Sequence, residues 1–492
     1  MKWLNRLYIL VALAVVSCAG KVEKHTGLRA ELEGLEDKTQ VILAGYLGER
    51  LYPKDTFYTD AKGAIYVADL TKYEKGMYAL VAHPQDTAKA TVIDLILAGE
   101  DFVHLQAQAG KRNESNHVKV LVSEENKILY DYLELMSAYQ TKMKSLEEQF
   151  QTSFSDDLKA KVEEEIKAET EALNKTQEQI IAGSLYANKM LALAIAPLVP
   201  EPPVTEQNID LWKSVYYRQH FWDNVDFTDE SLARSGFFER KLNNYLSLWP
   251  LEGVQNAVDE LIVKIPEKTE VYKVALLFFL TKFQHPSGMC LDSIFVHLVD
   301  QYVKTDKAFW LTADAKQRVI EQAENMAAVT CGKQAPDIRL MEPSGRFTSL
   351  YSIPSDYTVV VFWSHQCGHC VRDLPVMAEK MKKYAQNKVK VFAVEVEIET
   401  EGWIDFLKKN PLVSKNFINV SDTKDMRDNA VEYINSGKTT LESLNYRKVY
   451  GIYATPTILL LDKEKKILYK NLSVETLDQI LSSLLNDNMT KN

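Results

Sequence analysis

Several residue types are scarce in this 492-residue chain, and each shortage excludes a class of protein. Only 19 residues are glycine, which favours a helix-rich fold. Five cysteines are too few for a disulfide scaffold. After the first twenty residues, no apolar run is long enough to cross a bilayer. Acidic residues outnumber basic ones by 68 to 58, so we expect no nucleic-acid partner.

The remaining composition is that of a globular protein with several domains. Hydrophobic residues make up 46% of the chain and charged residues 26%, which excludes a disordered protein. A chain of this length exceeds what one hydrophobic core supports. We therefore expect a multidomain fold, with boundaries where the hydrophobic pattern changes.

The first seventeen residues read as a targeting segment. Two basic residues within positions 1–6 precede an apolar run over 7–16, which predicts a secretory signal over 1–17. Ten apolar residues are too few to span a membrane. Ser17-Cys18 resembles the lipobox of bacterial lipoproteins, which implies lipidation of Cys18 and a lipid anchor in the membrane. Cleavage without lipid is the alternative. We expect a membrane-anchored protein of the cell envelope or periplasm, where disulfides persist.

Three segments with different patterns follow the signal. Residues 18–122 contain short apolar runs, among them 41–47 and 77–82, which predict a β-sandwich-like domain. Residues 123–330 show helical spacing and predict an all-α domain. Its aromatic cluster over 216–223 favours a core, with a ligand groove as the alternative.

The last segment, 331–492, alternates between strand and helix patterns. An apolar strand over 357–363 leads into a helix from 367 to about 385, and another strand follows over 389–396. Such alternation predicts an α/β domain. A polar stretch over 423–448 is longer than a connection needs, and we expect it to form helix, either as a surface excursion or as a wall of the substrate site.

A Cys-x-x-Cys pair stands where that strand turns into the helix. Cys367 would lie at the helix N-terminus, where free N–H groups and the helix dipole favour a thiolate. Cys370 would lie one turn on, on the buried face. We therefore expect Cys367 to attack a disulfide and Cys370 to resolve the mixed disulfide. No cofactor is then needed beyond the dithiol.

Two neighbouring features leave alternatives open. His365 and His369 lie beside the two cysteines, so four metal ligands fall within six residues. We expect no metal there, because one helix start does not readily place four ligands tetrahedrally. Asp373 lies three residues after Cys370, where its carboxylate is a candidate base for the Cys370 proton. The alternative is a solvent-facing acid that only complements the helix dipole.

The C-terminal segment resembles the TlpA/ResA-like thiol-disulfide oxidoreductases of the thioredoxin superfamily. The matching residues are 332–337, Phe362, Trp363, 367–370, Asp373, Pro375 and 450–457. The resemblance implies a thioredoxin-like fold with a cis peptide bond before Pro456. It also implies that Thr455 offers its backbone to a substrate chain, and we expect Trp363 and His369 to contribute to the same substrate site. Family members usually have Glu where this chain has Asp373.

The whole architecture resembles lipoproteins of Bacteroidota. Those proteins join a β domain and a helical domain of unknown function to a thioredoxin-like end, and residues 217–227 carry the match in the middle segment. The resemblance implies a cell-envelope oxidoreductase that reduces or exchanges disulfides in secreted proteins, with a membrane protein as a candidate electron donor.

Two questions stay open at this level. Cys290 and Cys331 are expected to form a structural disulfide, with a second redox pair or two free thiols as alternatives. The direction of reaction is the other question, because Gly368-His369 resembles the dipeptide of protein disulfide isomerase and favours oxidation or isomerisation. A tethered binding module with an accessory dithiol is the competing function.

Overall fold

The computed structural model describes residues 26–86, 90–110, 117–284, 290–384, 386, 389–410 and 412–489. The signal expected over 1–17 and the lipidation expected at Cys18 lie outside these residues. No helix in the described part of the chain is long and apolar enough to cross a membrane. The chain divides into two compact units, the first comprising 1–225 with 231–238 and the second comprising 226–230 with 239–492.

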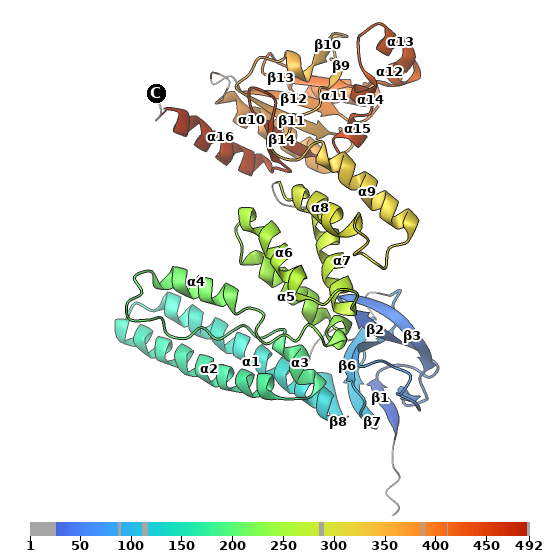
Figure 1. Ribbon diagram of the computed structural model, residues 1–492, viewed down its shortest axis with the longest axis vertical. Helices are drawn as coiled ribbons and strands as arrows, with labels where there is room; N and C mark the ends of the chain where they lie inside the picture. The colour runs from blue at the N-terminus through green and yellow to red at the C-terminus, as the bar shows by residue number, and fades with distance from the viewer. Residues whose placement is uncertain are drawn as a thin grey trace, which may run out of the picture. The chain divides into compact units, whose positions relative to one another are not determined.

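The first unit begins with two four-stranded sheets (Figure 1). Their strands are β1 (Gly27–Glu33), β2 (Gln40–Leu47), β3 (Arg50–Tyr58), β4 (Ala64–Val67), β5 (Gly76–Ala82), β6 (Thr91–Leu97), β7 (Phe102–Gln108) and β8 (Val118–Val122). The sheet orders are β4-β1-β7-β8 and β3-β2-β5-β6. Side chains of both sheets, such as Leu28, Leu43 and Leu95, belong to one buried core. This arrangement agrees with the layered β domain expected from the sequence.

Strand β3 has no counterpart among the predicted strands, for a physical reason. Most of its residues are exposed, so it has no apolar run, and it contains Pro53. A strand paired only with β2 at the edge of its sheet does not need a buried face.

Two long helices follow the sheets. The helices of the first unit are α1 (Glu124–Thr152), α2 (Asp156–Ala182), α3 (Tyr186–Ala192) and α4 (Ile209–Gln219), followed by the 3₁₀ helix η2 (Glu230–Arg234). Buried polar groups tie α1 to its neighbours: the Asn126 amide exchanges two hydrogen bonds with the Ile96 backbone on β6. The Glu125 carboxylate accepts from the first N–H groups of α3, those of Tyr186 and Ala187. These helices therefore pack with the sheets.

The second unit contains the other helices of the middle region. They are most of α5 (Gly236–Ser247), η3 (Leu251–Gly253), α6 (Val254–Lys264), α7 (Glu270–Gln284), α8 (Asp292–Leu298), the π-helical turn η4 (Val299–Val303) and α9 (Ala313–Ala327). The middle region is helical, as expected. However, the division into compact units cuts through the 123–330 segment that the sequence pattern treats as one domain.

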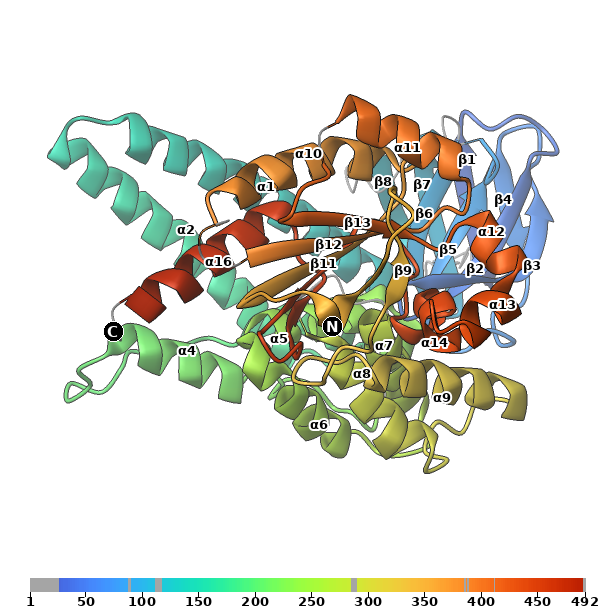
Figure 2. The same cartoon turned by 90° about the horizontal axis from the view of Figure 1, so that it is seen from above.

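The C-terminal part of the second unit is built on a seven-stranded sheet of order β10-β9-β13-β12-β11-β14-β15. Its strands are β9 (Arg339–Met341), β10 (Phe347–Ser349), β11 (Tyr357–Trp363), β12 (Val389–Glu395), β13 (Phe417–Ser421), β14 (Thr457–Leu461) and β15 (Ile467–Lys470). The 3₁₀ helix η5 (Leu350–Ser352) follows β10. The central strands β11, β12 and β13 are parallel, while β14 runs antiparallel to β11. Figure 2 shows these central strands in one sheet.

Helices cover both faces of this sheet. One face carries α10 (Gly368–Lys382), α11 (Thr400–Lys409) and α16 (Val474–Met489), whose buried side chains share a core with alternate residues of β11 and β12. The other face carries the lead-in segment and the helices α12 (Lys424–Asp428), α13 (Ala430–Asn435), α14 (Leu441–Leu444) and α15 (Tyr446–Val449).

The segment 423–448 forms these four short helices rather than one polar helix. Met426 and Tyr446 in the segment, and Tyr450 just after it, are fully or almost fully buried in the core of the second face. Tyr446 stacks on Phe362 of β11 with ring centroids 5.7 Å apart. The segment therefore builds part of the core, which a simple surface excursion would not do.

Candidate active site

The Cys-x-x-Cys pair lies at the end of the central strand β11. Cys367 is the residue that precedes the first residue of α10, and its N–H donates to the Ser364 carbonyl oxygen at 3.1 Å. The Cys367 side chain is partly exposed, whereas Cys370 is fully buried. Both cysteines are free in this structure. Their exposure agrees with the expected order, in which Cys367 meets the substrate first.

The surroundings separate the acidities of the two thiols. Burial acts to raise the pKa of Cys367, but hydrogen bonds from the Thr455 side chain, from Cys370 and from the His369 backbone outweigh it and lower the pKa below its usual value. Burial raises the pKa of Cys370 to about 12. At neutral pH, Cys367 is therefore the thiol that more readily forms a thiolate.

The loop before β14 faces the outer cysteine. The Thr455–Pro456 peptide bond is cis, as expected. In the thiol form, Cys367 Sγ donates to the Thr455 carbonyl oxygen at 3.2 Å. The backbone that is expected to pair with a substrate chain thus lies directly beside the attacking sulfur.

Arg372 links two of the expected site residues at the surface. Its guanidinium donates to Asp373 Oδ1 at 2.7 Å and lies 3.0 Å from His369 Nδ1. The Asp373 side chain is 29% exposed and its ion pair points to the neighbouring residue, not to a sulfur. The role of Asp373 as the base for Cys370 therefore stays a prediction, with the solvent-facing alternative better supported.

Trp363 does not lie where a substrate contact would require it. Its side chain is fully buried under α10 and α11, and its ring packs against Phe406 with centroids 5.2 Å apart. The expectation of a direct substrate contact by Trp363 needs correction, because its side chain is wholly enclosed in the core that also contains Cys370. Trp363 supports the base of the site instead.

A buried acid that the sequence analysis missed lies close to the motif. Glu395 ends β12, pairs in register with Trp363 and is fully buried. It lies on the same face of the sheet as Val391 and Ala393, which share a core with Cys370. Burial raises the pKa of Glu395 to about 8, although the N–H groups of Glu397 and His365 lower it. The available signal was an acid at the end of a strand that is apolar apart from Lys390.

His365 is the partner of this acid. His365 Nδ1 lies 3.2 Å from Glu395 Oε1, which also accepts from the His365 backbone N–H at 3.3 Å. Glu395 Oε2 is buried without a hydrogen-bond partner among the described residues. The imidazole lies against Gly402 of α11, where a Cβ atom would overlap its ring. This packing holds His365 toward Glu395, two residues before Cys367.

The two histidines near the motif have different partners. In the part of the chain that the structure describes, no group of three or more His, Cys, Asp or Glu side chains is arranged to hold a metal ion. His365 faces Glu395, whereas His369 faces Arg372. The two histidines thus point to different partners and do not converge with the thiols.

The other two cysteines among the described residues form the expected disulfide. Cys290 and Cys331 are bonded, with their Cα atoms 5.6 Å apart. Cys290 lies just before α8, and its sulfur also contacts the Leu468 carbonyl oxygen on β15 at 3.7 Å. Cys331 lies between α9 and the start of the sheet domain. The bond therefore joins the helices α8 and α9 to the sheet domain within the second unit.

Comparison with known proteins agrees with this geometry. Residues 331–470 match the AhpC/TSA family, and residues 159–327 match a domain of unknown function (DUF5106). The thiol-disulfide oxidoreductase ResA of Bacillus thuringiensis is 25% identical over 149 residues, which cover 30% of this chain and 73% of that protein. ResA of Geobacillus thermodenitrificans is 28% identical over 160 residues, which cover 32% and 79%. The C-terminal part of this chain is thus similar to the ResA/TlpA-like proteins, and the chain is a thiol-disulfide oxidoreductase with a thioredoxin-like domain.

Solved structures from Bacteroides also resemble this oxidoreductase. A thioredoxin-like protein from Bacteroides caccae is 20% identical with a TM-score of 0.44, over 58% of this chain and 97% of the other. The thioredoxin domain of a thiol-disulfide oxidoreductase from Bacteroides vulgatus is 21% identical with a TM-score of 0.26, over 32% and 98%.

Proposed function

We propose that the chain reduces disulfides in secreted proteins at the cell envelope, with Cys367 as the nucleophile and Cys370 as the resolving thiol. The observation that carries the proposal is the contrast between the two sulfurs. Cys367 is partly exposed with a lowered pKa, while Cys370 is buried with a pKa of about 12. An exposed thiolate beside a buried thiol suits attack followed by resolution.

The reaction proceeds in two exchanges. The Cys367 thiolate attacks one sulfur of a substrate disulfide, that bond breaks, and the other substrate sulfur leaves as a thiolate that takes up a proton. Cys370 then loses its proton and attacks Cys367 Sγ, which releases the second substrate thiolate. The substrate gains two electrons and the enzyme is left with a Cys367–Cys370 disulfide. A dithiol protein of the membrane is the proposed donor that reduces it again.

The second exchange needs a group that accepts the Cys370 proton. We include the His365–Glu395 pair in the proposal as that acceptor, alongside Asp373. Glu395 lies on the sheet face that α10 covers, and its unpartnered Oε2 and raised pKa suit a carboxyl group that exchanges protons near neutral pH.

The cellular place of the protein is part of the same proposal. The signal-like segment 1–17 and the lipobox-like Cys18 support export and a lipid anchor. The Cys290–Cys331 disulfide supports an oxidising compartment, since such bonds rarely persist in the cytosol.

The reduction potential of the Cys367–Cys370 pair tests the direction. Protein beginning at Ala19 is equilibrated in a series of glutathione buffers and its thiols are trapped, while mass spectrometry follows Cys290 and Cys331 separately. A potential at or below roughly −250 mV supports a reductase fed by a membrane donor. A potential at or above roughly −180 mV overturns that direction in favour of isomerisation or oxidation.

A further inference from the structure

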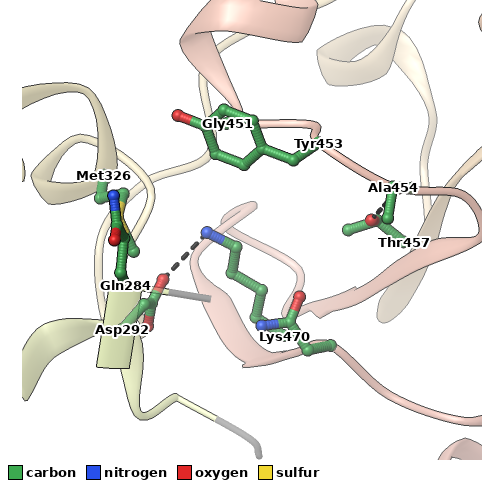
Figure 3. Close-up of a pocket in the computed structure, with 9 residues that line it drawn as sticks. Gln284, Asp292, Met326, Gly451, Tyr453, Ala454, Thr457 and Lys470 are labelled. Atoms are coloured by element: carbon green, nitrogen blue, oxygen red, sulfur yellow. Dashed lines mark hydrogen bonds and ion pairs between the residues drawn. The ribbon is translucent and has the colours of Figure 1, made fainter. Parts of the chain in front are cut away.

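A cavity of about 210 Å³ lies next to the Thr455-Pro456 loop, within the second unit. Figure 3 shows its lining side chains. They come from the ends of α7, α9 and β15, the start of α8 and the segments on both sides of Pro456: Gln284, Asp292, Met326, Gly451, Tyr453, Ala454, Thr457, Lys470 and Asn471. The helices of the middle region therefore supply one wall, and the oxidoreductase domain supplies the other.

The position of the cavity connects it to the reactive sulfur. Ala454 and Thr457 line the cavity and flank Thr455 and Pro456 in the chain. The carbonyl oxygen of Thr455 lies 3.2 Å from Cys367 Sγ. A peptide that pairs with the Thr455 backbone while Cys367 attacks its cysteine would place a residue close to that cysteine near the cavity.

The cavity contains a buried polar group that lacks a partner. Asp292 is 1% exposed, and its Oδ2 accepts from Lys470 Nζ at 2.9 Å. Its other oxygen, Oδ1, is buried and has no hydrogen-bond partner among the described residues. Leaving a buried acceptor unpaired costs free energy, so a donor from a ligand would be favoured there.

The Cys290–Cys331 disulfide holds this wall in place. Cys290 precedes Asp292 by two residues, and its sulfur contacts the backbone of Leu468, two residues before Lys470. The disulfide therefore restrains both α8, which carries Asp292, and β15, which carries Lys470. A site with so little freedom can select among ligands by hydrogen bonding.

The charges around Asp292 narrow the chemistry of the ligand. Asp292 and Lys470 neutralise each other, so a second cation would lie beside Lys470 and an anion would lie beside Asp292 Oδ1. A neutral donor satisfies Oδ1 without adding a buried charge. Among the other lining residues, Met326 and Ala454 are apolar, while Gln284, Thr457 and Asn471 add neutral polar groups.

We propose that this cavity is a substrate subsite for a neutral side chain with a hydrogen-bond donor, such as that of Asn, Gln, Ser or Thr, next to the attacked cysteine of a protein substrate. The inference rests on the proposed function and adds to it a preference for particular sequences. It also assigns a role to the middle helices, which build the wall that carries Asp292.

The test uses the full mature chain with Cys370→Ala, which stops the reaction at the mixed disulfide. The probes are blocked pentapeptides that carry one cysteine with Asn, Leu or Asp on either side of it, each supplied as its symmetrical disulfide. Cys367 attacks one sulfur, and one peptide leaves as a thiolate. Bis(2-hydroxyethyl) disulfide, which carries no peptide side chain, measures the reactivity of Cys367 alone.

We expect the Asn peptide to react about tenfold faster than the Leu and Asp peptides in at least one flanking position, because Asn is similar in size to both but alone brings a neutral donor. Equal rates for the three peptides in both positions would overturn the subsite while leaving the proposed function intact. Failure of Cys367 to react with the small disulfide would instead overturn the proposed function.

The variant D292L/K470M tests whether the preference for Asn depends on Asp292. Replacing a buried ion pair by apolar residues of similar size is often tolerated, and it removes Oδ1. The tenfold preference for Asn should fall below about twofold. The control D306L/K316M makes the same changes in a more exposed ion pair of the second unit and should retain the preference. If D292L/K470M retains the preference, Asp292 is not the group that recognises the Asn side chain, and the proposal is overturned. If D292L/K470M does not fold, the three peptides measured on the Cys370→Ala chain decide by themselves.

Discussion

The two pairs of cysteines in the second unit have the same chemistry and opposite surroundings. Cys367 and Cys370 are three residues apart, at the start of α10, and are free. Cys290 and Cys331 are 41 residues apart, at the ends of different helices, and are bonded. The first pair lies beside an exposed backbone loop, whereas the second joins two parts of the unit.

The difference shows that placement decides what a cysteine pair does. A pair on one helical turn closes a very short loop, so its bond adds little to the stability of the fold and is free to open and close. A pair that closes a loop of 41 residues restricts the unfolded chain. The first arrangement suits redox chemistry and the second suits a permanent link.

The largest expected effect comes from removing the nucleophile. Cys367→Ser should lower disulfide reduction at least about 1,000-fold, because a hydroxyl does not replace the thiolate. The assay is turnover of a protein disulfide with a regenerating dithiol. C290S/C331S should retain most of the activity when the folded protein is assayed. Loss of activity in C290S/C331S with the fold intact would assign redox chemistry to the second pair.

The second expected effect concerns stability. Here the Cys290–Cys331 pair should matter more than the Cys367–Cys370 pair. C290A/C331A should lose roughly 3–4 kcal/mol of the free energy of unfolding of the second unit, from the entropy that the bond removes from the unfolded chain. Denaturant unfolding under non-reducing conditions measures this loss. The matched variant C367A/C370A should change the free energy by less than about 1.5 kcal/mol. Equal losses in the two variants would contradict the structural role of the bond.

The third prediction concerns the buried acid Glu395, which lies near the Cys367–Cys370 pair and makes stability depend on pH. The pKa of Glu395 is raised to about 8, so the folded protein keeps a proton that the unfolded chain loses near pH 4.5. Its stabilising contribution is complete below pH 4.5 and falls as the pH rises toward about 8, by up to about 1.4 kcal/mol per unit.

The variant E395Q keeps the size of the side chain and removes this titration. Its unfolding free energy should depend less on pH between 4.5 and 8 than that of the wild type. If Glu395 also takes part in the second exchange, E395Q should slow resolution of a mixed disulfide more than its formation. An unchanged pH dependence would show that Glu395 is ionised in the folded protein.

The smallest expected effect concerns the loop beside Cys367. Thr455→Val removes a hydrogen bond that lowers the pKa of Cys367, so that pKa should rise. The rate of Cys367 alkylation at pH 7 should then fall about two- to fivefold, since it follows the thiolate fraction. The pH dependence of alkylation measures both quantities, and Thr457→Val, at the first residue of β14, offers a control. A lower pKa in T455V would contradict the assigned hydrogen bond.

Much of the catalytic domain could be predicted from local pattern. The apolar run over 357–363 coincides with β11, and the helical pattern after Cys367 coincides with α10. The substrate contact expected of Trp363 was wrong, while the role expected of Asp373 as a base stays a prediction. Strand alternation turns Trp363 into the core, and an adjacent arginine draws Asp373 into a surface ion pair.

The sequence by itself determined the dithiol, its exposure order and the domain that carries it. These depend on neighbours within one strand and one helical turn, where periodicity is readable. Only the tertiary structure decided that His365 meets Glu395 and that Asp292 meets Lys470, which lies 178 residues further along the chain. Such pairings depend on strand register and helix packing, which local hydrophobic patterns do not predict.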